Sequence, residues 1–485
     1  MNSTFFTSSR KKNSYLVNLQ KKSILFVHPL IPAIYYDDKQ TYSNFSDIEL
    51  DYYYRKLMYF RKYNLISDYL DIVCKPFEIT PQMVEESIAN TNQVVFETTQ
   101  RCNLKCKYCF YEDFYDTRIN NEHVDLTSEK AYKVIEYIID KLSSFNNSSD
   151  TTIYMSFYGG EPLLNTVLIS DTIDYCKKID KNLRIPKYTI TTNGTLLNKH
   201  IKLLVDNNFR IYVTLDGNKN NNSYRTYPNK ANSFNSIMSN LTLVKEKYPD
   251  YFKQNILFNA VLHNRNSVND IHNFFKENFD KRPTILELNN SGIKESKKEE
   301  FNEMFHSKIE DIQHLNTCKD DDFDMTMRNP IYNSVALFLN QYLWFVYKTY
   351  RHQLIREKKE YQLSTGTCIP FSKKIFITAD GKILPCEKIS HDHALGFVTK
   401  KGVSIDCQAI AEKYNKLIKQ LSRQCQTCYK LFACKQCLFF VDKNNPVCYA
   451  YMNGLGFANY IQSMISFVEE HPKEYHVIMS EVLFN

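Results

Sequence analysis

No run of apolar residues in the chain approaches the ~20 that a helix needs to span a bilayer, so no membrane partner is expected. Residues 1–13 are polar and lack the apolar core of a signal peptide, which favours a cytoplasmic protein. The net charge of +7 is modest and spread along the sequence. It favours an acidic peptide over a neutral one and does not indicate nucleic acid. With 485 residues, 43% of them apolar, the chain is expected to form two or three globular domains.

Cysteine, in contrast, is abundant. Fourteen cysteines in a large chain without secretory features favour metal or cluster ligation over disulfides. Ten of them fall into two patterned groups, and the four left over are Cys74, Cys176, Cys318 and Cys407. A spare cysteine is most often a small buried apolar residue.

The first group has the spacing Cys102-x3-Cys106-x2-Cys109 and is followed at once by two aromatic residues. Zinc sites usually come as CxxC pairs, whereas three thiolates in one short loop leave a fourth coordination position unfilled. An iron–sulfur cluster held by three cysteines has one iron free to take a further ligand. A zinc site or three unrelated thiols remains the alternative.

Residues from about 90 to 290 alternate β-rich runs with amphipathic helical stretches, the pattern of repeated βα units, and the domain that they form is expected to span residues 90–330. A helix is expected to start near Thr127, a plausible N-cap, because apolar residues recur on one face beyond it. Six such units predict an α/β fold, a partial (β/α)6 barrel of the TIM type, with its motifs at the carboxyl ends of the strands. The expected strands are residues 94–99, 152–158, 187–192, 210–215, 256–262 and 284–288.

The remaining segments lie outside this repeat. Residues 1–89 read as an α+β region with strands at 23–27 and 33–36 and a helix at 48–63. A bridging segment, 331–364, contains a helix expected at 331–347 that Pro330 opens. Residues 365–450 hold the second cysteine group, and 451–485 are expected to form a C-terminal helix and a short end segment.

From Glu97 to Cys109 the chain closely resembles the radical S-adenosylmethionine (SAM) enzymes. The resemblance implies a [4Fe–4S] cluster on Cys102, Cys106 and Cys109, whose free iron binds SAM, and it places Tyr108 among the cofactor-binding residues. An electron from the cluster cleaves SAM to a 5′-deoxyadenosyl radical in that family, so the cofactors carry the hard chemistry. The electron is expected from an external donor such as flavodoxin or ferredoxin.

Three later loops fit the same resemblance. Gly159, Gly160 and Glu161 match its GGE motif, which implies that backbone carbonyls and the glutamate hold the SAM ammonium group. The run Thr192-Asn193-Gly194 ends the third expected strand and enters a loop, and Asn193 is expected among the cofactor-binding residues. Thr214, in the sequence Thr-Leu-Asp-Gly, and Arg225 are implied to contact the SAM ribose and carboxylate. Taken alone, each of these short motifs is as well explained by an ordinary turn.

The second cysteine group resembles the SPASM extension of radical SAM peptide-modifying enzymes, which carries two auxiliary [4Fe–4S] clusters. The resemblance implies one complete ligand set, Cys425, Cys428, Cys434 and Cys448, and one incomplete set, Cys368, Cys386 and Cys437. The last gap is shorter than usual, and an eighth cysteine is missing before Cys368. The incomplete set is therefore either open at one iron or closed by Cys318 or a substrate thiol. A zinc knuckle is the alternative for the inner CxxC pairs.

Glu387 follows Cys386 at the position where related sulfatase-maturing enzymes have an aspartate base, so a catalytic base and a surface carboxylate are both open. The leading hypothesis is a maturase that abstracts hydrogen from a ribosomally made precursor peptide or protein and forms a thioether or carbon–carbon crosslink. Residues 1–89 would then recognise a leader peptide. The alternatives are an anaerobic sulfatase-maturating enzyme, which makes formylglycine, and a cysteine-rich zinc scaffold protein.

Overall fold

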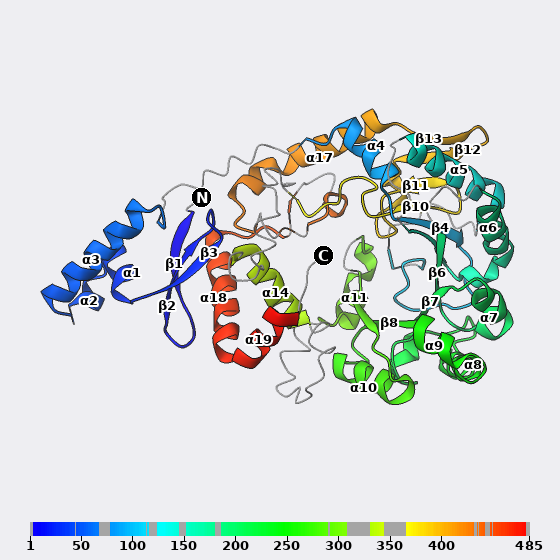
Figure 1. Cartoon of the computed structure of the whole chain (residues 1–485). Coiled ribbons are helices and arrows are strands. Elements are labelled where there is room, and N and C mark those ends of the chain that lie inside the picture. Colours follow the sequence, from blue (N-terminus) through cyan, green and yellow to red (C-terminus); the bar gives the residue numbers. More distant parts are fainter. Residues whose placement is uncertain are drawn as a thin grey trace. The chain divides into compact units, whose positions relative to one another are not determined.

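A computed structural model describes most of the chain and divides it into two compact units (Figure 1). Unit 1 contains residues 1–77, 318–367 and 417–485, and unit 2 contains residues 78–317 and 368–416. The described residues are 3–43, 45–66, 78–112, 114–115, 124–144, 152–179, 186–289, 292–307, 330–343, 365–430, 434, 436–441, 447–448 and 450–481. None of the helices within these ranges is both long and apolar enough to cross a membrane.

Unit 2 is built around a sheet in which six parallel strands follow one another in chain order, which confirms the expected partial barrel. These strands have few exposed residues, as parallel strands covered on both faces do. The strands are β4 (Gln93–Thr99), β5 (Ile153–Gly159), β6 (Pro186–Thr192), β7 (Arg210–Thr214), β8 (Ile256–Leu262) and β9 (Thr284–Glu287).

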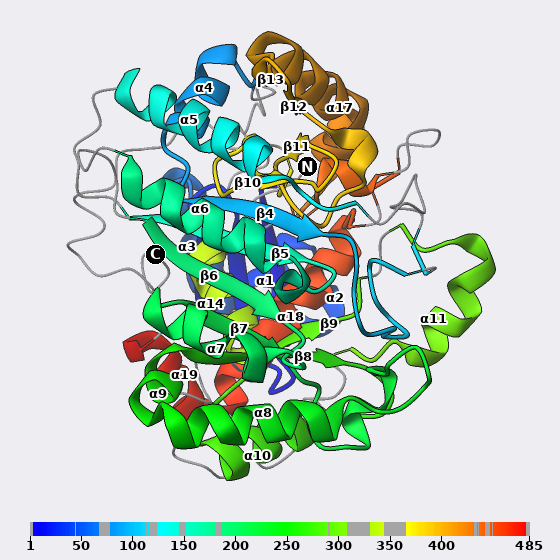
Figure 2. The same cartoon turned by 90° about the vertical axis from the view of Figure 1, so that its right-hand side faces the viewer.

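Helices connect these strands and lie along the sheet (Figure 2). The helix α5 begins where expected, because Thr127 Oγ1 accepts a hydrogen bond from the N–H of Lys130 at 3.4 Å and so caps it. The helices are α4 (Pro81–Ala89), α5 (Ser128–Ser144), α6 (Thr166–Lys178), α7 (Leu197–Asp206), α8 (Phe234–Lys247), α9 (Pro249–Asn255), α10 (Val268–Phe279) and α11 (Lys298–Met304).

Four short strands from the cysteine-rich segment extend the same sheet beyond β4. The strand β10 (Ile375–Ile377) pairs parallel with β4, and β11 (Lys382–Leu384), β12 (Gly396–Thr399) and β13 (Gly402–Ile405) continue antiparallel. The helix α17 (Cys407–Thr427) follows them. Residues far apart in the sequence are thereby joined in one sheet, and this arrangement brings the segment around Cys386 beside β4.

Unit 1 contains an antiparallel three-stranded sheet, β1 (Thr4–Ser8), β2 (Ser14–Asn18) and β3 (Ser23–Val27). Its helices are α1 (Leu30–Tyr35), α2 (Lys39–Tyr42), α3 (Asp47–Lys62), α14 (Pro330–Tyr342), α18 (Gly454–Glu470) and α19 (Pro472–Glu481). The strand at 23–27, the helix near 48–63 and the start of the bridging helix at Pro330 are confirmed. Residues 344–364 lie outside the described residues.

Two expectations for unit 1 are wrong. Residues 33–36 form the end of α1 and not a strand, because the preceding apolar residues Leu30 and Ile31 turn inward with Ala33 on one buried helix face. Pro32 is tolerated there because it lies in the first helical turn, where its missing N–H has no intrahelical partner to lose. The C-terminal region also forms two helices, α18 and α19, with His471 between them.

Candidate functional site

The three-cysteine loop starts directly after β4, and hydrogen bonds from its backbone hold it in place. The N–H of Lys105 donates to the carbonyl of Thr226 at 2.7 Å, and the N–H of Lys107 donates to that of Tyr224 at 3.0 Å. Its three cysteines belong to one packed cluster of side chains, together with Leu104, Tyr108 and Tyr224. The loop is therefore held in a defined shape by the residues that follow β7.

The chemistry of these thiols fits a thiolate-bound cluster. The N–H groups of Leu104 and Tyr111 donate to the sulfurs of Cys102 and Cys109, each at 3.4 Å. Burial raises the pKa of Cys102 and of Cys109 to about 12 and raises the pKa of Cys106 as well. Buried thiols of this kind become thiolates where a bound cation offsets the loss of solvent. No three His, Cys, Asp or Glu side chains of the described residues are arranged to hold a single metal ion.

The two glycines of the Gly-Gly-Glu loop are required by close backbone approach. A Cβ on Gly160 would lie 2.2 Å from the carbonyl oxygen of Arg101, and Gly159 has a φ of +130°. The N–H of Gly160 donates to the carbonyl of Thr99 at 2.9 Å. The loop after β5 therefore lies directly against the start of the three-cysteine loop, and only glycine permits this contact.

Glu161 is completely buried and ties the loop after β5 to the end of β6. Its Oε1 accepts hydrogen bonds from Thr192 Oγ1 at 2.7 Å and from the N–H of Leu163 at 3.1 Å, and its Oε2 accepts from the N–H of Asn193 at 2.8 Å. Burial raises the pKa of Glu161, while these hydrogen bonds act in the opposite direction. These hydrogen bonds hold the carboxylate rigidly, and a buried carboxylate of this kind can pair with a cationic group.

The side chain of Asn193 connects the same region to the cysteines. Its Nδ2 donates to Asn103 Oδ1 at 2.8 Å and approaches Cys102 Sγ at 3.8 Å. Asn103 in turn donates to Thr195 Oγ1 at 2.8 Å. Glu161 and Asn193, both predicted from sequence, are therefore brought together with the first cysteine.

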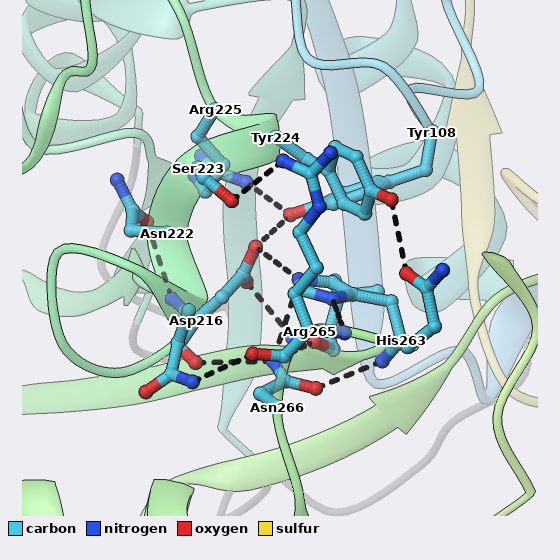
Figure 3. Close-up of polar contacts among 12 residues, drawn as sticks. Tyr108, Asp216, Asn222, Ser223, Tyr224, Arg225, His263, Arg265 and Asn266 are labelled. Carbon is cyan, nitrogen blue, oxygen red and sulfur yellow. Dashed lines mark hydrogen bonds and ion pairs between the residues drawn. The ribbon is translucent and has the colours of Figure 1, made fainter.

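Arg225 and Tyr108 lie close together near Asp216 (Figure 3). Arg225 Nη1 donates to the phenol oxygen of Tyr108 at 3.2 Å, and that phenol donates to Asp216 Oδ2. Thr214 is the last residue of β7, and Asp216, two residues later, is the polar centre of this loop. Asp216 is not among the site residues predicted from sequence.

Glu387 is paired with a lysine. Lys374 Nζ lies 3.1 Å and 3.2 Å from the two carboxylate oxygens of Glu387, and the thiol of Cys386 donates to Oε2 at 3.6 Å. Tyr158, at the end of β5, lies within electrostatic reach of both this carboxylate and Cys109. Burial, then the charges of Glu387 and Cys109, raise the pKa of the Tyr158 phenol above its ordinary value. The residues after β11 and the first cysteine loop thus flank one tyrosine.

Unit 1 gathers four cysteines of the second group around one small pocket, together with Thr365, Leu421 and Tyr451. The N–H of Cys428 donates to the carbonyl of Cys425 at 3.2 Å, which starts the turn after α17. The four are Cys425, Cys428, Cys434 and Cys448, the set that the sequence predicts to be complete. A pocket that concentrates four thiols is the donor set that a [4Fe–4S] cluster uses.

The three cysteines of the incomplete set are divided between the two units. Cys437 lies in unit 1 and precedes a short turn in which the N–H of Leu438 donates to Thr367 Oγ1 at 2.9 Å. Cys368 and Cys386 lie in unit 2. Cys318 lies outside the described residues. Common ligation by this set stays a prediction.

The structure adds three residues that the sequence patterns did not single out. They are Asp216, His263 and Lys374. His263 could have been found, because it is the polar residue that directly follows the expected strand 256–262, at the edge where the other motifs lie. Lys374 carries no such signal, since it precedes a strand of only three residues.

Comparison with known proteins assigns this arrangement to a class. Residues 96–277 match the radical SAM superfamily. The chain therefore contains a radical SAM domain and is an enzyme, so the zinc scaffold alternative is set aside. The family implies one [4Fe–4S] cluster and SAM as cofactors.

Curated relatives match a part of the chain of similar length. The cysteine-type anaerobic sulfatase-maturating enzyme of Clostridium novyi is 30% identical over 190 residues, which are 38% of this chain and 48% of that protein. The radical SAM cyclopropyl synthase TigE of Paramaledivibacter caminithermalis is 30% identical over 208 residues, 41% of this chain and 42% of that protein. The chain thus spans about half the length of the curated relatives it matches.

Two solved structures are similar at low identity. Native anSMEcpe with bound AdoMet and the Cp18Cys peptide is 18% identical, with a TM-score of 0.46, and the match covers 80% of this chain and 98% of that one. Streptococcus suis SuiB bound to the precursor peptide SuiA is 15% identical, with a TM-score of 0.37, and the match covers 80% and 82%.

Proposed function

We propose that the protein is a radical SAM peptide maturase, which abstracts hydrogen from a ribosomally made peptide and closes a thioether or carbon–carbon crosslink. The observation that carries the proposal is the convergence, in unit 2, of four elements at the carboxyl ends of neighbouring parallel strands. The elements are the three-cysteine loop, Glu161, Asn193 and Arg225.

Each of these residues would bind a different part of the cofactors. Cys102, Cys106 and Cys109 would hold the cluster, and the carboxylate of Glu161 would face the ammonium group of SAM. Arg225 would bind the SAM carboxylate. Thr214, the half-buried last residue of β7, would face the ribose. When bound, these cofactors supply a 5′-deoxyadenosyl radical.

Glu387 would act as the base that accepts the proton released as the crosslink closes. Its position after β11 supports this role because Tyr158 lies within electrostatic reach of both Glu387 and Cys109 of the first cysteine loop. Lys374 would hold the carboxylate in place through their ion pair. The predicted auxiliary clusters, one on the four pocket cysteines of unit 1, would pass the product's electron onward.

The N-terminal part of unit 1 would recognise the leader of the precursor. The strand β3 exposes Phe26 to 67%, and α3 exposes Tyr52, Tyr54 and Tyr59 to more than half. Large exposed aromatic side chains in one region mark interaction surfaces more often than chance. An extended leader segment suits such a surface, since aromatic rings bind peptide with little loss of side-chain entropy.

The test uses anaerobically reconstituted protein with a reductant, SAM and the precursor peptide encoded nearest to its gene. Formation of 5′-deoxyadenosine together with the loss of one pair of hydrogens from the peptide is the expected result. Formation of 5′-deoxyadenosine alone, with every tested cysteine-containing precursor unchanged, would contradict the maturase proposal.

The second candidate is an anaerobic sulfatase-maturating enzyme. The match to a curated enzyme of that name favours it, because the two proteins are 30% identical over 190 residues. A sulfatase-derived peptide whose cysteine or serine is converted to an aldehyde would identify this activity. Reaction of the product with a hydrazide distinguishes the aldehyde from a crosslink.

A further inference from the structure

Arg225 is a buried cation with an unused donor. The residue is 5% exposed and follows the short turn η2 (Asn221–Tyr224). Its Nη1 is occupied by Tyr108, whereas its Nε–H is buried and has no hydrogen-bond partner. A buried donor of this kind calls for an acceptor from outside the protein chain. Nε and the adjacent amino group form the edge of the guanidinium that pairs with a carboxylate through two parallel bonds.

Asp216 holds the phenol of Tyr108 in place, and this phenol in turn holds Arg225. Its Oδ2 accepts from Tyr108, so the phenol oxygen is left to accept from Arg225. Its Oδ1 accepts from the N–H of Val261 at 3.0 Å, and its carbonyl accepts from Asn266 Nδ2 at 3.1 Å. Hydrogen bonds from Tyr108 and Val261 to its two oxygens restrict the rotation of the Asp216 carboxylate (Figure 3).

His263 supports the same carboxylate from β8. Its Nδ1 accepts a hydrogen bond from the N–H of Arg265 at 3.1 Å, so a neutral ring carries its proton on Nε2. Nε2 lies 3.6 Å from Asp216 Oδ2, and both side chains are fully buried. Nε2 also lies 3.4 Å from Asn266 Nδ2, so the imidazole packs against both Asp216 and Asn266.

The separation between the charges of Asp216 and Arg225 affects how Arg225 can bind an anionic ligand. A carboxylate in direct contact with Arg225 would occupy the fork of the guanidinium and compete with an anionic ligand. Here the phenol of Tyr108 stands between Asp216 and Arg225, so a negative charge is near while the Nε edge stays open. The guanidinium also lies close to the three-cysteine loop, because its charge acts on both Cys102 and Cys106.

We propose that Tyr108 and Asp216 are positioning residues that hold the Nε edge of Arg225 toward the carboxylate of SAM and so make binding depend on that carboxylate. The inference rests on the proposed cofactor site and adds residues that act through Arg225. Tyr108 acts here through its hydroxyl, whose two hydrogen bonds are both made within the protein.

The test compares two ligands, SAM and decarboxylated SAM, which lacks the carboxylate. Dissociation constants are measured for the anaerobically reconstituted full chain and for Tyr108→Phe, with iron content and the cluster's visible absorbance recorded for each. Tyr108→Phe should weaken SAM roughly tenfold and decarboxylated SAM less than about twofold, since one hydrogen bond to a charged group is lost. Tyr224→Phe is the matched control, because its hydroxyl bonds instead to Asn264 at 2.9 Å.

A double variant of Tyr108 and Arg225 distinguishes a positioning role of Tyr108 from a packing role. In an Arg225→Lys background, Tyr108→Phe should have little further effect on SAM, because the residue through which it acts is already changed. Asp216→Asn should show the same dependence on the carboxylate. Equal weakening of both ligands by Tyr108→Phe, or additive loss in the double variant, would overturn the inference. A wild-type protein that binds neither ligand would overturn the cofactor site itself.

Discussion

The carboxylate of Glu161 accepts a hydrogen bond from the backbone N–H of Asn193 at 2.8 Å and thereby joins the loops that follow β5 and β6. Two further donors, from Thr192 and Leu163, complete the environment of this buried carboxylate. The contact explains why Glu161 is both a candidate ligand for SAM and a structural element of unit 2.

Glu161→Gln should destabilise unit 2 and weaken SAM binding. The NH₂ of the new amide would face one of the three groups that now donate to the carboxylate, so that one buried donor would lose its acceptor. We therefore expect a loss of roughly 2–3 kcal/mol in the free energy of unfolding. Denaturant unfolding measures this loss. Glu246→Gln on the exposed face of α8 is the control and should leave both the unfolding curve and SAM binding unchanged. Equal stability of the two variants would show that the three hydrogen bonds contribute nothing net.

Gly160→Ala should prevent the loop after β5 from approaching the three-cysteine loop. Its Cβ would meet the backbone of Arg101 at 2.2 Å, which no side-chain movement can relieve. We expect loss of the first cluster, seen as about four fewer irons per chain, and no formation of 5′-deoxyadenosine. Gly456→Ala in α18 is the control, since its Cβ would meet only side-chain atoms, at 3.3 Å and beyond. A Gly160→Ala protein with full iron would contradict this reading.

The cysteine pocket of unit 1 predicts a definite iron count. Reconstituted protein should hold about twelve irons per chain, and Cys425→Ser combined with Cys428→Ser should lower this to about eight. The cleavage of SAM should persist in the double variant, because the first loop is untouched. Zinc in place of iron, or about four irons in the unchanged protein, would return the pocket to a structural zinc site.

Glu469 makes the stability of unit 1 depend on pH. Burial acts to raise the pKa of Glu469, but hydrogen bonds from Tyr15, Ser9 and Asn13 lower it below the ordinary 4.5. A lowered pKa contributes stability that is present above 4.5 and is lost as the pH falls through the folded value. Glu469→Gln should therefore cost about 1 kcal/mol near neutral pH.

That difference should disappear as the pH falls through the lowered pKa of Glu469, below which the glutamate itself is protonated. Thermal unfolding from neutral to acidic pH measures it. Glu470→Gln is the control, since Glu470 makes only an ion pair at 3.2 Å with the well-exposed Arg10. A Glu469→Gln effect that does not change with pH would assign the loss to packing.

The sequence predicts the six parallel strands because each is a short apolar run bounded by turns and separated by helical periodicity. The three-cysteine and Gly-Gly-Glu loops were equally accessible, since both are contiguous motifs. The β10–β13 strands were not, because three or four residues are too few to show a period. The run at 33–36 is similarly short, and burial of Leu30 and Ile31 decided in favour of a helix.

The contacts around Arg225 could not be predicted for a different reason. Tyr108 and Asp216 are 108 residues apart, and His263 follows another strand. Only the sheet order places the ends of β4, β7 and β8 at one edge, and no spacing in the sequence contains that order. The Lys374–Glu387 pair depends in the same way on the pairing of β10 with β11.

Lys374→Met should separate SAM cleavage from product formation. Lys374 lies within 3.2 Å of both oxygens of Glu387, so its loss frees the carboxylate to move away from the substrate and raises the cost of its charge. We expect 5′-deoxyadenosine to form at nearly the normal rate while modified peptide falls about tenfold, and Glu387→Gln should lower it by roughly a hundredfold or more. Lys374→Arg should restore most of the product because it keeps the charge and reach.

Both products are measured by liquid chromatography and mass spectrometry in the same reaction. Lys373→Met, a neighbouring exposed lysine, should change neither. Glu387→Gln with unimpaired product would remove Glu387 from the mechanism, since an amide cannot accept the proton. Parallel loss of 5′-deoxyadenosine and peptide product in Lys374→Met would instead show that the ion pair supports the fold around β10 and not the base.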